Sequence, residues 1–176
     1  MTKDKRSSNH RSDAPIFLIG FMGAGKTTVG RELARQLDYD FLDLDELIAR
    51  QAGKSVQEIF AELGEYEFRN LEREAIRSCE RLTRAVVALG GGAYEDEDNR
   101  NVLRRIGRPI WLDCSLEVCL RRISGDTSRP LAGDDNAMRE LMDQRRDAYA
   151  EAAYVVQTGE KNPEQLAIEI MGLFDE

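Results

Sequence analysis

The sequence predicts an α/β fold, a three-layer α/β/α domain on a five-stranded parallel sheet. Short apolar runs alternate along the chain with longer segments of helical periodicity. Strands separated by helices form parallel sheets that are covered on both faces. With 176 residues, 41% hydrophobic and 33% charged, the chain has the size and composition of one globular domain, which we place at 15–176. The strands are predicted at 16–19, 41–44, 85–89, 110–112 and 154–157.

Helical periodicity fills the segments between these strands. Ser55 and Glu58 form a capping box at one helix start, and Asn162 precedes Pro163 at another, which suits a cap followed by the first helical position. Asp45 is expected to cap the helix that begins at residue 46. The helices are predicted at 25–37, 46–51, 56–63, 65–81, 97–106, 116–123, 137–149 and 163–174.

Charge and composition exclude several classes of function. The formal net charge of −8 argues against a general partner that is itself anionic, such as nucleic acid or a membrane surface. Residues 1–14 are charged and lack an apolar centre, so they are expected to be a disordered tail and not a secretory signal. No apolar run approaches the roughly 18 residues that span a bilayer. We therefore expect a cytoplasmic protein.

The cysteines and the single histidine are not expected to be catalytic or metal-binding residues. Cys79, Cys114 and Cys119 include no CxxC pair and are expected to be buried free thiols of a reducing compartment. His10 is the only histidine and lies in the polar tail, which makes a histidine-based metal site or catalytic triad implausible.

A phosphate-binding loop follows the first predicted strand. Residues 20–27 read GFMGAGKT and match GxxxxGK[ST], the P-loop, between a strand and a helix as the motif requires. Glycines let successive backbone N–H groups turn around phosphates, and the helix start adds its positive dipole end. Lys26 supplies a charge at the β- and γ-phosphates, and the Thr27 hydroxyl ligates Mg²⁺. The sequence thus predicts binding of ATP with Mg²⁺.

Two further segments follow strand ends and are expected to meet this loop. Asp43 and Asp45 flank Leu44, so strand alternation turns both carboxylates to one face. One carboxylate suits a metal held through water and the other an acceptor hydroxyl, although Asp45 also suits a plain helix cap. The triplet 90–92 is Gly-Gly-Gly, which allows close approach to a ligand or serves as a simple turn. Parallel strands bring these segments to one edge, where ligands bind.

The basic residues are less specific. Arg69 lies in a charged helix, where an arginine is often a solvated partner of a neighbouring glutamate, and Arg145 has the same ambiguity. Arg129 lies in a polar segment with Gly and Pro, which predicts a mobile loop from which an arginine closes over the γ-phosphate. Phe60 and Phe68 are expected in the core.

Taken together, these segments resemble the shikimate kinase family. The resemblance covers nearly the whole chain beyond the tail, with the motifs in the family order. It implies an ATP:shikimate phosphotransferase of chorismate and aromatic amino-acid biosynthesis, with a P-loop kinase fold, a lid at 124–136 and a helical substrate-binding subdomain at 46–80. The matching stretches are FLIGFMGAGKTTVGRELA (17–34), FLDLDELI (41–48), SVQEIFAELGEYEFRNLE (55–72), ALGGGA (88–93), SRPLAG (128–133) and QRRDAY (144–149).

The resemblance also implies roles for individual residues. Thr27 would ligate Mg²⁺ directly and Asp43 through water, while Asp45 would bind substrate hydroxyls and act as the base. Arg69 and Arg145 would pair with the shikimate carboxylate. The remaining implied contacts are the phosphates with Gly23, Ala24, Gly25, Lys26, Thr27 and Thr28; a ring hydroxyl with Gly91 between Gly90 and Gly92; ATP from the lid with Arg129; and adenine with Arg122 and the turn ending at Pro163.

Two departures from the family pattern leave questions open. The segment 129–132 reads RPLA where the family carries RPLL, and Asp147 stands where a proline is common. Adjacent Arg145 and Arg146 leave open which of them holds the carboxylate. A kinase of another acceptor, such as gluconate, remains the nearest alternative, ahead of a nucleoside monophosphate kinase and a non-catalytic nucleotide-binding module. We expect a monomer.

Overall fold

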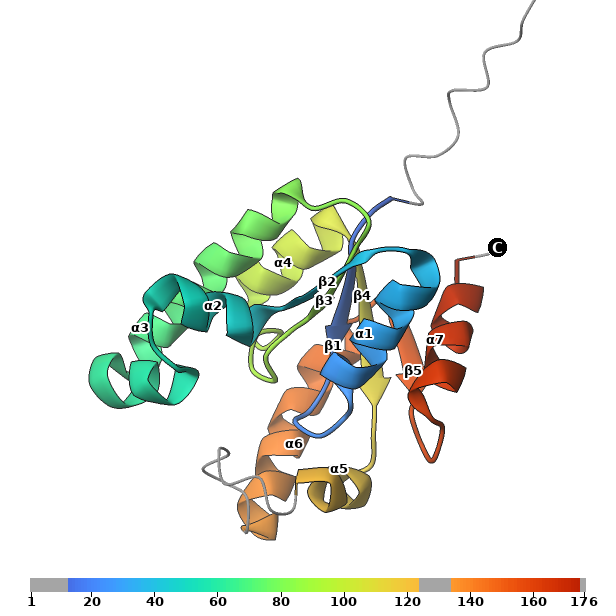
Figure 1. Cartoon of the computed structure of the whole chain (residues 1–176). Helices are drawn as coiled ribbons and strands as arrows, with labels where there is room; N and C mark the ends of the chain where they lie inside the picture. Colours follow the sequence, from blue (N-terminus) through green and yellow to red (C-terminus); the bar gives the residue numbers. More distant parts are fainter. Residues whose placement is uncertain (1–12, 124–133, 175–176) are drawn as a thin grey trace, which may run out of the picture.

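The predicted five-stranded parallel sheet is confirmed by the structure, a computed structural model that describes residues 13–123 and 134–174 (Figure 1). All neighbouring strands pair in parallel, in the order β2-β3-β1-β4-β5. The strand that precedes the phosphate loop is therefore central, and the strand that carries Asp43 lies at an edge. The strands are β1 (Ile16–Ile19), β2 (Asp40–Asp43), β3 (Ala85–Ala88), β4 (Arg108–Asp113) and β5 (Tyr154–Gln157).

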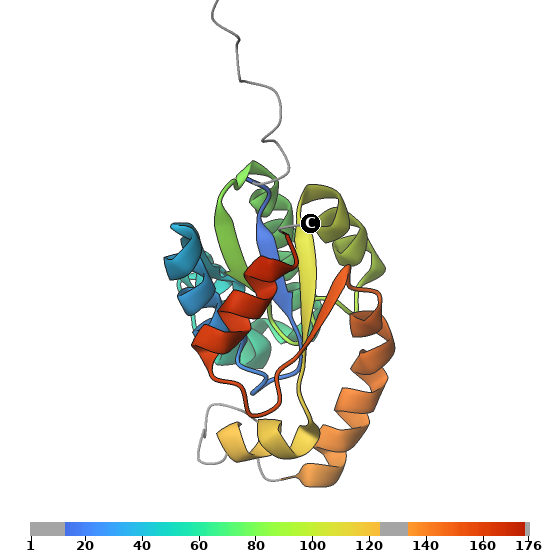
Figure 2. The same cartoon turned by 90° about the vertical axis from the view of Figure 1, so that its right-hand side faces the viewer.

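Helices cover both faces of the sheet and give three layers. Helices α1 and α7 pack side by side on one face, and α4 and α6 lie on the other (Figure 2). Helix α2 and the first half of α3 extend beyond the β2 edge (Figure 1). The helices are α1 (Lys26–Leu37), α2 (Leu44–Ala52), α3 (Val56–Ser78), the 3₁₀ turn η1 (Cys79–Arg81), α4 (Glu97–Ile106), α5 (Leu116–Ile123), α6 (Asp135–Ala150) and α7 (Pro163–Gly172).

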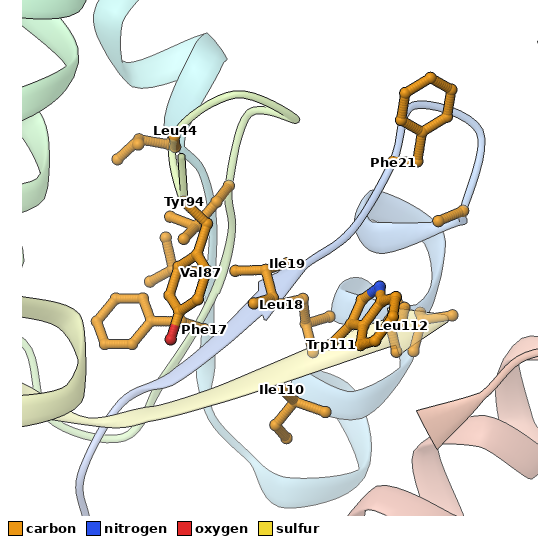
Figure 3. Packing of buried hydrophobic residues seen from close by; sticks show 14 of the residues in the cluster. Phe17, Leu18, Ile19, Phe21, Leu44, Val87, Tyr94, Ile110, Trp111 and Leu112 are labelled. Carbon is orange, nitrogen blue, oxygen red and sulfur yellow. The ribbon is translucent and has the colours of Figure 1, made fainter. Parts of the chain in front are cut away.

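The core lies on both faces of the three central strands. Every residue of β1 and β3 is buried, as expected for parallel strands covered on both sides. Phe17 and Tyr94 pack together on one side of β1, while Trp111 lies on β4 (Figure 3). This rigid core fixes the strand ends, and the loops that follow those ends inherit their positions.

The cap chemistry of two helices is confirmed, and that of a third is corrected. Ser55 with Glu58 and Asn162 with Gln165 each form a capping box. At α2 the cap is Asp43, whose side chain accepts from the Asp45 and Glu46 amides, so the assignment of the cap to Asp45 was wrong. The strand ends one residue earlier than predicted, and the helix begins at Leu44.

Helix α3 contains the break that the sequence placed between two helices. Gly64 has φ 81° and ψ 172°, a conformation that glycine adopts without a Cβ penalty. Residues on either side of it continue as helix, so the segment is one long element with a kink. Residues on both sides of the kink line the cleft described below, and α3 also packs against α4.

Other expectations are confirmed or lie outside the described residues. All three cysteines are buried free thiols. In the described part of the chain, no helix is both long enough and apolar enough to cross a bilayer. Most of the predicted tail (1–14) and of the predicted lid (124–136), including Arg129, falls outside the described residues.

Candidate active site

A cleft of about 1070 Å³ opens at the carboxyl ends of β1, β2 and β3. The loop after β1, the aspartate pair after β2 and the glycine triplet after β3 all line it, so the predicted convergence of these segments is confirmed. Helices α3, α5 and α6 supply its arginines. The polar and charged lining residues are Lys26, Thr27, Thr28, Asp43, Asp45, Glu46, Glu65, Arg69, Glu72, Arg122 and Arg145.

The phosphate loop curls over the start of α1. Gly23 and Gly25 have φ of 79° and 98°, and a Cβ on Gly23 would lie 2.7 Å from the Cys119 carbonyl oxygen. The Lys26 ammonium donates to the carbonyls of Gly20 and Phe21 at 2.8 and 3.0 Å. The lysine charge and the positive end of α1 are thus both directed to the loop, the arrangement that binds phosphate.

Beside the loop, a hydroxyl and a carboxylate lie together. Thr27 Oγ1 donates to Asp43 Oδ2 at 2.9 Å, while Asp43 Oδ1 accepts from the Asp45 amide at 3.1 Å. Within residues 13–123 and 134–174, no group of three or more His, Cys, Asp or Glu side chains is placed to hold a metal ion. A hydroxyl with one carboxylate fits Mg²⁺ that takes its other ligands from phosphates and water, and does not form an all-protein cage.

Asp45 reaches the cleft from the first turn of α2. A Cβ built on Gly90 would lie 2.8 Å from Asp45 Oδ1, so only glycine leaves room for the carboxylate there. Leu44, between the two aspartates, is fully buried. Both aspartates face the cleft as predicted, but the reason was wrong, because Asp45 belongs to a helix and strand alternation does not orient it.

The rest of the glycine triplet lies against the two arginines. A Cβ on Gly92 would lie 2.6 Å from Arg69 Nη2, and one on Gly91 would lie 3.1 Å from Arg145 Nη1. Any side chain at either position would displace or crowd the guanidinium group. The triplet is therefore a surface on which an aspartate and two arginines converge, and not merely a turn.

Arg69 both pairs with glutamates of its own helix and lines the cleft, so the two roles that its sequence allowed coexist. It donates to Glu65 Oε1 at 3.4 Å and to Glu72 Oε1 at 2.8 Å, and it also lines the cleft. Glu72 is only 1% exposed, and its Oε2 is buried with no hydrogen-bond partner among the described residues. Burial raises the pKa of Glu72, an effect that the Arg69 charge partly offsets.

The structure separates the adjacent arginines of α6. Arg145 is 8% exposed, lines the cleft, and donates from Nε to Glu95 Oε1 at 3.1 Å. Arg146 points elsewhere: it pairs with Asp113 at 3.5 Å, and its guanidinium lies 5.4 Å from the centre of the Trp111 ring. Arg145 alone of the two is therefore positioned to hold a ligand in the cleft.

Of the residues expected near adenine, Arg122 lines the cleft and Pro163 does not. Arg122 lines the cleft and donates to the carbonyls of Gly23 and Ala24 at 3.3 and 3.2 Å. Ala24 is buried beneath the loop and contributes backbone only. Pro163 occupies the first turn of α7 and is not among the residues that line the cleft.

Sequence reasoning missed part of the lining. Phe60 and Phe68 lie with ring centroids 4.5 Å apart and both line the cleft, so the core assignment was wrong for Phe60, which is 38% exposed. Glu72 was not singled out among the glutamates of its helix. Its spacing of three residues from Arg69 is the signal that could have found it, because that spacing places both on one helix face.

Comparisons with known proteins point to one family. The family model described as shikimate kinase matches residues 22–174. A shikimate kinase from Geobacter sulfurreducens is 48% identical over 158 residues, with 88% of this chain and 87% of that protein covered. One from Trichormus variabilis is 43% identical over 160 residues, with 89% and 88% covered.

Solved structures agree with the sequence relatives. A shikimate kinase from Acinetobacter baumannii in complex with shikimate superposes with a TM-score of 0.88 at 36% identity, covering 93% of both chains. One from Aquifex aeolicus gives 0.80 at 35% identity, covering 89% of this chain and 94% of that one. A deoxyadenosine kinase from M. mycoides, 14% identical with a TM-score of 0.62, shares the fold alone.

Proposed function

This chain belongs to the shikimate kinase family and is an ATP-dependent kinase of shikimate, and from that premise we propose how its residues bind and join the two substrates. The main support for the proposal is that a phosphate loop, two aspartates and two largely buried arginines meet around a glycine triplet in one cleft. The reaction transfers the γ-phosphoryl group of ATP to the 3-hydroxyl of shikimate and yields ADP and shikimate 3-phosphate.

The shikimate carboxylate binds between Arg69 and Arg145. Both guanidinium groups lie against the glycine triplet, at Gly92 and Gly91 respectively, and both are largely withdrawn from water. Charge-assisted bonds of this kind contribute about 1.5–3 kcal/mol each. With the carboxylate fixed at one end, the ring is held so that one hydroxyl lies in line with the transferred phosphoryl group.

The ring hydroxyls face Asp45 and the backbone of the glycine triplet. Asp45 lies against Gly90, one residue from the Gly91 backbone that we assign to a ring hydroxyl. The carboxylate of Asp45 accepts the proton of the attacking hydroxyl as that oxygen bonds to phosphorus, and ADP leaves with the electron pair of the broken P–O bond. Asp45 thereby orients the nucleophile before transfer and takes its proton during transfer.

The phosphates of ATP bind in the loop, contacted by the backbone from Gly23 to Thr28. Lys26 exchanges its contacts with the Gly20 and Phe21 carbonyls for phosphate oxygens when the nucleotide enters, so its charge follows the transferred group. Arg122 bonds the Gly23 and Ala24 carbonyls of the loop, and we assign it to the side of the loop that faces the adenine. Arg129, which we expect to contact ATP, falls outside the described residues.

Thr27 and Asp43 would hold the Mg²⁺ ion, Thr27 directly and Asp43 through water. When bound, the ion neutralises charge on the β- and γ-phosphates. Asp43 has a second task, because its other oxygen caps α2 and so fixes the backbone of Asp45. One aspartate thus orients the segment that carries the other.

We propose that the protein works as a cytoplasmic monomer without nucleic-acid or membrane partners. Three buried free thiols agree with a reducing compartment. The net charge of −8 opposes binding to polyanions, while the cleft itself concentrates Lys26, Arg69, Arg122 and Arg145.

Coupled ADP release from Mg-ATP tests the function. The acceptors are shikimate, gluconate and other hydroxy acids, a nucleoside monophosphate, and no acceptor. ADP release should rise only with shikimate and should stop when a chelator removes Mg²⁺. Equal release with gluconate would assign another acceptor, and release without any acceptor would contradict a dedicated small-molecule kinase.

A further inference from the structure

The loop after β3 that contains Gly90–Gly92, here called the glycine turn, is hydrogen-bonded to helix α6. The proposed reaction assigns no role to this bond. The Tyr149 hydroxyl donates to the carbonyl of Gly91 at 2.5 Å. Tyr149 is only 2% exposed, and its ring lies 5.9 Å from that of Trp111. Burial raises the pKa of Tyr149, so the phenol keeps its proton and remains a donor at neutral pH.

A second contact holds the same turn one helical turn earlier on α6. Arg145, four residues before Tyr149, lies on the same helix face and donates to Glu95 Oε1 at 3.1 Å. Its Nη1 also lies beside Gly91. Two contacts, Tyr149 with Gly91 and Arg145 with Glu95, therefore join α6 to the loop after β3, and we call this pair of contacts the α6 clamp.

The other side of this turn is fixed to α4. Asn99 Nδ2 donates to the Ala93 carbonyl at 3.0 Å, and Arg73 on α3 pairs with Asp96 at 2.9 Å. Within the turn, the Ala93 amide donates to the Gly90 carbonyl at 3.1 Å. These contacts fix the end of the turn, but they leave the carbonyl of Gly91 to the clamp.

Three consecutive glycines form a flexible backbone segment, which the clamp holds in one conformation. Glycine samples more backbone conformations than any other residue, and ordering it costs correspondingly more entropy. The carbonyl of Gly91 shares one planar trans peptide with the amide of Gly92, so the two point in opposite directions. A donor that fixes this peptide therefore holds the Gly91 backbone, which we assign to a ring hydroxyl, in one orientation before any ligand arrives, and this lowers the cost of binding.

We infer that Tyr149 and Glu95 are positioning residues for shikimate, with Tyr149 fixing the glycine turn and Glu95 fixing the Arg145 guanidinium. The inference rests on the proposed placement of the shikimate carboxylate and ring hydroxyls at these groups. Neither residue touches the substrate. Both act through groups that do, so their loss should weaken shikimate binding and leave ATP binding in place.

Tyr149→Phe tests the hydrogen bond while it keeps the ring. We expect the KM for shikimate to rise about tenfold, as for the loss of one buried hydrogen bond with its acceptor left unpaired, and the KM for ATP to stay within about twofold. Tyr94→Phe is the matched control. Tyr94 is equally buried, packs beside Phe17 (Figure 3), and its hydroxyl has no hydrogen-bond partner among the described residues. Its KM values should not change.

Glu95→Gln tests the other half of the clamp and is tolerant of folding, because the Glu95 side chain is 37% exposed. We expect about a fivefold rise in the KM for shikimate alone, the effect of loosening one charge-assisted contact. Glu80→Gln is its control, since Glu80 in η1 pairs with Arg105 of α4 at similar exposure. If Tyr149→Phe did not fold, the KM of Glu95→Gln for shikimate would still test the clamp.

Trp111 gives an independent readout of binding. It is the only tryptophan and contacts the Tyr149 ring, so its fluorescence should titrate with shikimate. The inference predicts a weaker Kd for Tyr149→Phe than for Tyr94→Phe, in the absence of ATP. Two variants that match their controls in KM and Kd would overturn the clamp while shikimate turnover by the unaltered protein stands. Absence of that turnover would instead refute the proposed function.

Discussion

The Thr27 hydroxyl lies 2.9 Å from a carboxylate oxygen of Asp43, although Thr27 follows strand β1, Asp43 ends strand β2, and β3 separates these two strands in the sheet. This contact joins the phosphate loop to the aspartate pair. It also places together the two oxygen donors that we assign to Mg²⁺.

Thr27→Val keeps the shape of the side chain and removes its hydroxyl. We expect kcat to fall by about a hundredfold or more and the Mg²⁺ concentration for half-maximal rate to rise, because one metal ligand is lost. Loss of one hydrogen bond should lower the free energy of unfolding by only about 0.5–1.5 kcal/mol. Activity titrated with Mg²⁺ checks this, with exposed Thr83→Val as the control. An unchanged Mg²⁺ requirement would refute the assignment.

Lys26→Ala removes the charge from the phosphate loop. We expect turnover to fall by about 10³-fold or more, since this charge stabilises the transferred phosphoryl group. The fold should persist, because the ammonium bonds carbonyls of the phosphate loop and Lys26 does not belong to the buried core. The measurements are coupled ADP release and circular dichroism, with Lys54→Ala on the surface as the control. Full activity in Lys26→Ala would remove the loop from the mechanism.

Asp45→Asn leaves a side chain of the same size that no longer accepts a proton readily. We expect kcat to fall by about 10²–10⁴-fold, the usual contribution of a general base. Asp43 caps α2, so the helix should remain and thermal stability should change little. Asp40→Asn, at an exposed position of β2, serves as the control. A variant with near-normal kcat would show that transfer needs no base at Asp45.

Arg69→Ala separates substrate binding from nucleotide binding. We expect the KM for shikimate to rise by about a hundredfold and that for ATP to change by less than about threefold, because the lost partner is the carboxylate. Arg77→Ala, on the exposed face of α3, is the control. Steady-state kinetics with each substrate varied in turn gives both constants, and parallel rises in the two would argue against carboxylate pairing.

Glu72→Gln tests the buried carboxylate beside Arg69. Burial raises the pKa of Glu72 in the folded protein, so folding favours its protonated form. The stability this gives is complete below the pKa of the unfolded chain and is lost as pH rises through the raised pKa. The difference in Tm between Glu72→Gln and the unaltered protein should therefore shift in favour of the variant from pH 4.5 towards pH 7. A constant difference over this range would show that Glu72 does not titrate there.

The sequence predicted most of the site, because its main parts follow strand ends. The loop at 20–27, the aspartates and the glycine triplet each lie within a few residues of a strand, and parallel topology brings such ends together. The same reasoning failed at Asp45, where the end of β2 differs by one residue and a helix replaces the expected strand.

What the sequence could not supply was which helix face turns inward. Arg145 and Arg146 are equivalent in pattern, yet adjacent residues on a helix point about 100° apart, and only the packing of α6 on the glycine turn selects Arg145. Phe60 was expected in the core, yet it is 38% exposed and lines the cleft. It lies in the part of α3 before the kink at Gly64.

The order of strands supports the phosphate loop more firmly than the two aspartates. The phosphate loop extends from the central strand, which β3 and β4 flank on both sides. The aspartates extend from β2, an edge strand with no fully buried residue. Fraying of that margin would abolish proton transfer and metal binding while the nucleotide cradle stayed intact. The proposed general base and metal ligand therefore depend on an edge strand, which lacks the second neighbouring strand that supports the phosphate loop.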